Sequence, residues 1–109
     1  MIAYEVSHNG KVVCIAGAED LAILTTHITA VGKLGNKTIP FHPEEKTGRV
    51  SLSVTGLTKR KDSKKDVHLR WVGHSELKVG DIIQVRVLKT KVADKPKSRM
   101  KAGEPKKTS

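Results

Sequence analysis

The chain has 109 residues and a mass of 11.9 kDa, and its 21 Lys or Arg against 11 Asp or Glu give a formal net charge of +10. This length fits one domain with a small core, and the absence of any run of 18 apolar residues excludes a membrane-spanning helix. The positive excess favours an anionic partner, such as a nucleic acid or an acidic protein surface, over a solvated surface that simply keeps the protein soluble.

The N-terminal segment predicts a β-hairpin. Two apolar-rich runs, residues 2–7 and 12–16, flank the dipeptide Asn9-Gly10. Both residues tolerate the positive φ angles of a type I′ turn, whose twist matches that of the strands it joins. Cys14 lies in the second run and reads as a small core residue; as the only cysteine it forms no intrachain disulfide, which is compatible with a reducing, cytoplasmic location.

Residues 21–31 can be read in two ways. Leu21, Leu24, Ile28 and Val31 recur at helical spacing, but the segment is rich in Thr, Ile and Val, whose stiff β-branched side chains favour a strand. We therefore expect a strand, with a helix as the alternative.

Residues 32–48 contain three Gly and two Pro, which predicts a long loop anchored by Leu34, Ile39 and Phe41. The following segment, 49–57, alternates regularly between apolar residues and Ser or Thr. This period of two predicts a half-buried strand.

Residues 58–66 hold five basic side chains and no apolar one, which predicts an exposed loop. Val67, Leu69 and Trp71 alternate with polar residues as in a strand, and we expect a turn at residues 73–76. A last strand over 82–88 carries apolar residues on both faces, which suggests a central position in its sheet.

Residues 89–109 carry eight Lys or Arg, two acids and almost no apolar residue, so we expect a basic disordered tail after a single β domain at 1–88. The fold class expected for the domain is all-β, a small antiparallel barrel or sandwich of about six strands.

No pattern in the sequence points to catalysis, a cofactor or a metal. The five histidines show no local ligand spacing, Cys14 is surrounded by aliphatic residues, and no GxSxG or phosphate-binding glycine motif occurs. We therefore expect a protein that is not an enzyme, with no catalytic, cofactor-binding or metal-binding residues.

The basic segments are the remaining candidates for contact with an anionic partner. Their residues are Lys59, Arg60, Lys61, Lys64, Lys65, Arg70, Lys89, Lys91, Lys95, Lys97, Arg99 and Lys101. Such contacts are insensitive to sequence and sensitive to salt. Stacking of bases is poorly provided for, because the aromatic residues are only Tyr4, Phe41 and Trp71, and Trp71 falls in register with core positions.

The segments His68-Leu69-Arg70-Trp71 and LKVGDIIQVRV at 77–87 give the chain a family resemblance. Over residues 2–88 it resembles a small uncharacterised bacterial β-protein family with an HLRW…LKVGDxIxVRV C-terminal pattern. The resemblance implies a bacterial β domain and carries over no site residue.

These observations favour a non-enzymatic interaction module that binds a macromolecular partner, protein or nucleic acid, through a β-sheet face or edge with help from the basic segments. A nucleic-acid-binding accessory protein is one alternative, and a toxin-immunity or inhibitor protein is another. Homo-oligomerisation through a sheet edge is a further expectation, and no membrane partner is expected.

Overall fold

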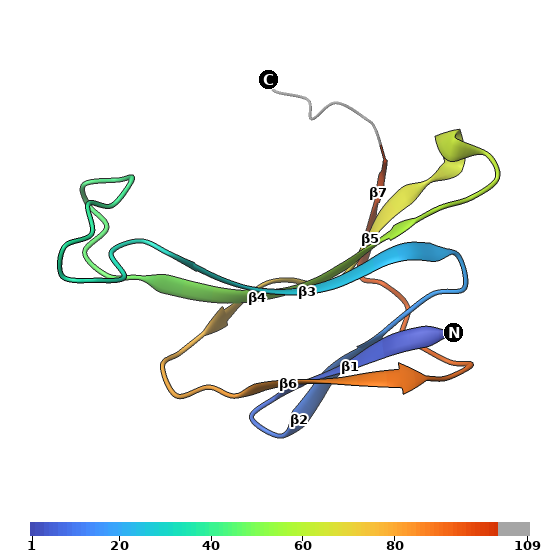
Figure 1. The fold of residues 1–109 in the computed structure, drawn as a ribbon, viewed down its shortest axis with the longest axis horizontal. Coiled ribbons are helices and arrows are strands. Elements are labelled where there is room, and N and C mark those ends of the chain that lie inside the picture. The colour runs from blue at the N-terminus through green and yellow to red at the C-terminus, as the bar shows by residue number, and fades with distance from the viewer. Residues whose placement is uncertain (103–109) are drawn as a thin grey trace.

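The computed structural model describes residues 1–102, which form seven strands in two antiparallel sheets (Figure 1). The strands are β1 (Ile2–His8), β2 (Lys11–Ala16), β3 (Leu21–Val31), β4 (Arg49–Thr58), β5 (Val67–Leu77), β6 (Ile83–Lys89) and β7 (Ser98–Lys101). A single 3₁₀ turn, η1 (Ser63–Lys65), lies between β4 and β5. The all-β prediction is confirmed, with two packed sheets and one strand more than expected.

Sheet A has the strand order β2-β1-β6. The β1–β2 hairpin turns at Asn9 and Gly10, whose φ angles of 51° and 84° are the positive values that the dipeptide predicts. A β-bulge lies in β2, where Val13 has no partner between Val6 and Ser7 of β1.

Sheet B has the order β3-β4-β5-β7. Residues 21–31 form β3, which pairs with β4 over its whole length, so the strand prediction is confirmed and the helical spacing is coincidental. The 32–48 segment is the loop of this hairpin, and we call it the arm loop because it projects from the body at the left of Figure 1.

The core lies between the two sheets. Val6, Cys14 and Ala16 of sheet A pack with the alternating residues Leu52 and Val54 of β4. Trp71 is 1% exposed, which confirms its core role. Gly56 makes room for it: a Cβ there would lie 2.9 Å from Leu21 Cδ2 and 3.3 Å from Trp71 Cζ3.

Three expectations about strands and loops were wrong. The turn expected at 73–76 lies inside β5, which continues to Leu77. The register with β4 shifts on both sides of Val54, so β5 stays paired although it has more residues there than β4. The last strand, β6, is at an edge of sheet A because β1 takes the central place. Leu34, Ile39 and Phe41 do not anchor the arm loop to the body: all three are exposed, and no element among residues 1–102 covers them.

The expectation of a disordered tail is corrected for residues 89–102. β7 pairs with β5, and Asp94 holds the preceding connection to the body through three hydrogen bonds: Ile15 N to Asp94 Oδ2 and Asp94 N to Ile15 O, both 2.8 Å, and Trp71 Nε1 to Asp94 O at 2.8 Å. Backbone pairing at a free sheet edge requires no apolar side chains, so composition did not reveal it. The rest of the tail, 103–109, lies outside the described residues.

Within residues 1–102 no helix is long and apolar enough to cross a membrane.

Candidate functional site

Sheet B has a polar surface that faces away from sheet A, which we call the outer face. In Figure 1 sheet A lies below sheet B, and the upper surface of sheet B rises at one end toward the arm loop and at the other toward β7. Residues that pair across antiparallel strands share a face, so the register gives its composition. Three cross-strand rows follow one another along it: Ile23, Leu57, His68 and Met100; Thr25, Thr55, Arg70 and Ser98; and His27 with Ser53.

The middle of the outer face consists of hydroxyl and imidazole groups. Thr29 and Ser51 pair in the next row, where Glu76 of β5 adds an exposed carboxylate, and the hydroxyls of Thr25 and Thr55 lie 3.0 Å apart. Ser51 and Thr55 alternate with the buried positions of β4 and therefore project outward, and their β3 partners Thr29 and Thr25 share this face. The Ser and Thr alternation in the sequence was the signal for this surface, but only the pairing of β4 with β3 and β5 makes it continuous.

Arg70 lies in the second row of the outer face and forms no ion pair with a carboxylate of residues 1–102. It lines a shallow pocket of about 430 Å³ together with Thr55, His68, Leu69, Ser98, Arg99 and Met100. Arg70 lies on β5 and Ser98 and Arg99 on β7, so the pocket exists only because β7 is paired with β5. A guanidinium beside hydroxyl and imidazole groups is an arrangement that binds oxyanions.

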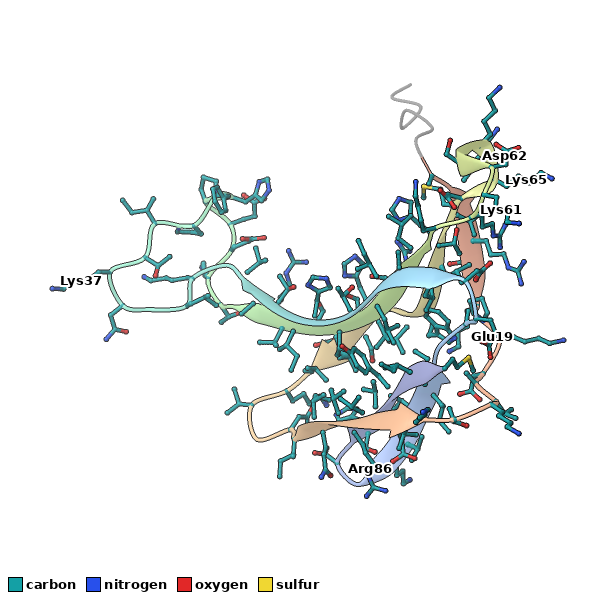
Figure 2. The ribbon with its side chains drawn as sticks, turned by 45° about the vertical axis from the view of Figure 1, so that its right-hand side comes forward. Glu19, Lys37, Lys61, Asp62, Lys65 and Arg86 are labelled. Atoms are coloured by element: carbon teal, nitrogen blue, oxygen red, sulfur yellow. The ribbon has the colours of Figure 1, made fainter. Side chains whose placement is uncertain are left out.

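Residues 59–65, which we call the basic loop, continue the outer face beyond its first row. Figure 2 shows Lys61 and Lys65 at the upper right of the molecule, near the end of β7. Asp66 holds the base of the loop: its Oδ1 accepts from Arg60 N at 2.7 Å and from Thr58 Oγ1 at 3.2 Å. Its carbonyl oxygen accepts from Ala102 N at 2.9 Å, which joins the end of β7 to the basic loop.

The candidate cations separate into three groups. Arg60 is structural, because its Nε donates to Asp20 Oδ2 at 2.8 Å and its NH1 group donates to Lys65 O at 2.8 Å. Lys89 ends β6 in sheet A, and Lys91, Lys95 and Lys97 lie on the connection between β6 and β7.

The third group gathers at one end of sheet B, and we call it the basic end. Its members are Lys59, Lys61, Lys64, Lys65, Arg70, Arg99 and Lys101. None of them is paired with a carboxylate within residues 1–102, and all are exposed.

The opposite end of the outer face is closer to neutral. A second shallow pocket, of about 410 Å³, is lined there by Arg49, His74 and Glu76 among others. Arg49 is neutralised by Glu45, whose Oε1 lies 2.9 Å from the guanidinium. The sequence analysis did not single out Arg49. Because Glu45 neutralises it, the net positive charge of the outer face increases toward the basic end.

Two groups outside this face have shifted acidities. Burial, followed by the negative charge of Asp94, raises the pKa of the Cys14 thiol to about 11, which makes it a poor nucleophile. Hydrogen bonds from Lys78 N, Asn9 and His8 lower the pKa of Asp81 to about 2. Among residues 1–102 no three His, Cys, Asp or Glu side chains converge to hold a metal ion.

No protein-family model, curated protein or solved structure matches this chain.

Proposed function

We propose that this protein is a non-enzymatic interaction module that holds an anionic macromolecular partner on the outer face of sheet B, at the basic end. The observation that carries the proposal is the place of β7. By pairing with β5 it places Ser98 beside Arg70 on the outer face and holds Arg99 and Lys101 at the same edge of the sheet, where their partners Leu69 and Val67 direct them toward its other side. Cations from three separate segments of the chain, β5, β7 and the basic loop, therefore gather around one end of sheet B.

The physical reason is additive attraction. Exposed cations that lack carboxylate partners raise the local potential together, and a polyanion that contacts several of them releases its own counterions. One carboxylate, that of Asp62, lies within the basic loop, and its Oδ1 accepts a hydrogen bond from the backbone N–H of Lys64 at 3.0 Å. The affinity should therefore depend on where the charge lies as well as on the net charge of the chain.

Charge reversal tests this dependence. The variant Lys61→Glu/Lys64→Glu/Lys65→Glu changes the basic loop, and Lys33→Glu/Lys37→Glu/Lys46→Glu makes the same change in net charge on the arm loop, where Figure 2 places Lys37. On immobilised heparin, used as a general polyanion, the basic-loop variant should elute at clearly lower salt than the arm-loop variant. Equal elution of the two variants, with circular dichroism showing both folded, would mean that the charge acts diffusely and that the module has no such site.

A second candidate function is self-association through the edge of sheet A. One edge of β6 is unpaired within residues 1–102. Val85 and Val87 on this strand are 40% and 67% exposed, and Ile82, just before the strand, is 68% exposed. An open strand with exposed apolar residues is a template for pairing with a second chain.

Sedimentation velocity over a range of concentrations tests self-association. The wild type and the control Val92→Lys, which changes an exposed valine outside any strand, should form dimers as concentration rises, and Val87→Lys should stay monomeric. A wild type that remains monomeric throughout would remove this candidate.

A further inference from the structure

The basic end and the hydroxyl-rich middle of the outer face are one continuous surface, and together they select among anionic partners. This selection rests on the proposed function and concerns the class of the partner. From the basic loop to the row of His27 and Ser53, which precedes the carboxylate of Glu76, the surface follows β4 for about five residues, or about 17 Å at 3.3 Å per residue.

The cations of this surface form a line rather than a single point. The lysines of the basic loop lie beyond the first row of the outer face, and Arg70 lies in the second row. A linear polymer with one anionic group per repeat matches such a line, and a nucleic-acid strand in a duplex advances about 3.4 Å per nucleotide. The surface would accommodate roughly five nucleotides by this measure.

The Arg70 pocket has the chemistry of a phosphate site. A guanidinium offers a planar fork of N–H donors that matches two phosphate oxygens, and Thr55 and Ser98 contribute hydroxyl groups to the same pocket. Ser and Thr hydroxyls are ordinary partners of phosphate and sugar oxygens in nucleic-acid complexes. Next to the pocket, Ser53 and the hydroxyl pair of Thr25 and Thr55 extend this lining along β4.

The middle of this surface suits a nucleic acid better than an acidic protein. Protein interfaces place buried aromatic or aliphatic anchors at their centre, whereas interfaces with nucleic acid are polar and positively charged. Here the centre is formed by hydroxyls and His27, and the exposed apolar residues Ile23 and Met100 lie in the outermost row. The rows of the outer face contain no aromatic ring other than histidine, so binding should use the backbone and discriminate little between sequences.

We propose that the outer face of sheet B binds the sugar-phosphate backbone of a nucleic acid, with a phosphate in the Arg70 pocket and neighbouring phosphates on the basic loop. Arg70 is the binding residue that distinguishes this proposal from diffuse attraction, because it is the cation that projects among the hydroxyls. Arg49 lies on the same sheet but is neutralised by Glu45, which makes it a matched control.

Fluorescence anisotropy with the full chain tests the proposal. The probes are a labelled 12-nucleotide single-stranded RNA, the DNA of the same sequence and its duplex, each titrated at several salt concentrations. Arg70→Gln should weaken binding to the preferred probe about tenfold at physiological salt and lower the salt slope by the equivalent of one phosphate contact, about 0.7 for a single strand or 0.9 for a duplex. Arg49→Gln should leave both quantities close to wild type.

The outcomes separate the two proposals. If Arg70→Gln and Arg49→Gln behave alike while both remain folded by circular dichroism, the phosphate site is wrong. If no probe binds but heparin retention still depends on the basic loop, the partner is an anionic macromolecule other than nucleic acid and the proposed function stands. If heparin retention is also insensitive to the basic loop, both proposals fail.

Discussion

At the scale of single residues, Asp81 shows how a carboxylate can join two turns. Its Oδ2 accepts from Lys78 N at 2.8 Å and lies 2.9 Å from His8 Nε2, and its Oδ1 accepts from Asn9 Nδ2 at 3.0 Å. Asn9 Oδ1 in turn accepts from Ile82 N at 2.8 Å. The turn of the first hairpin is thereby fixed to the turn that precedes β6, residues more than 70 positions apart.

The charge of Asp81 should stabilise the fold in a pH-dependent way. Hydrogen bonds to the ionised form hold its folded-state pKa at about 2, below the ordinary value of 3.8, so this contribution is present in full above pH 3.8 and is lost as the pH falls toward 2. Asp81→Asn should lower the Tm at pH 7, and the gap to wild type should close between pH 4 and pH 2. Thermal unfolding followed by circular dichroism measures both, with Glu44→Gln as an exposed control; a gap that is constant with pH would contradict the assignment.

At the scale of elements, β7 is the strand that decides the candidate site. It is four residues long and all four are exposed, so its place depends on backbone pairing with β5 and on the hydrogen bonds at its two ends. Lys97 N donates to Arg70 O at 2.8 Å before the strand, and Ala102 N donates to Asp66 O at 2.9 Å after it. A strand held in this way gives the basic end its shape without adding to the core.

A proline substitution in β7 tests how much the backbone pairing of this strand with β5 contributes to stability and to binding. Because hydrogen-bonded positions alternate along an antiparallel ladder, the bond from Ala102 N directs the N–H of Met100 toward β5 and that of Lys101 away. Met100→Pro should therefore lower the free energy of unfolding by about 1 kcal/mol or more and weaken heparin retention, because Arg99 leaves the edge. Urea unfolding should show a smaller change for the control Lys101→Pro, and equal losses would argue against this register.

At the scale of the whole molecule, the chain is more extended than its length requires. Its radius of gyration is 16.4 Å, against about 13 Å for a compact domain of this size. The long β3–β4 hairpin and its arm loop account for the extension in Figure 1. The core is correspondingly small and confined to the region where the two sheets face each other.

This shape predicts a sharp contrast between two apolar residues of the same hairpin. Leu52 is 1% exposed and Phe41 is 91% exposed. Leu52→Ala should lower the free energy of unfolding by about 2–5 kcal/mol, because it removes buried contacts and leaves a cavity. Phe41→Ala should change it by less than about 0.5 kcal/mol. Chemical denaturation of the two variants measures the contrast, and a large loss for Phe41→Ala would show that the arm loop packs against the body.

The sequence by itself determined the all-β class, the Asn9-Gly10 hairpin and the alternation of β4, because turn chemistry and the period of two are local properties. It also placed Trp71 in the core and located the basic loop. These predictions depended on residues that are close together in the chain.

Only the tertiary structure decided which edges are paired. β6 lies at an edge because β1 pairs with it and with β2, and β7 forms because the edge of β5 was left open. Backbone hydrogen bonds are nearly independent of side-chain type, so a polar, lysine-rich segment could occupy that edge without any sign in its composition. The same pairing placed Arg70, Ser98 and Arg99 in one pocket, a juxtaposition of residues almost 30 positions apart that no local pattern encodes.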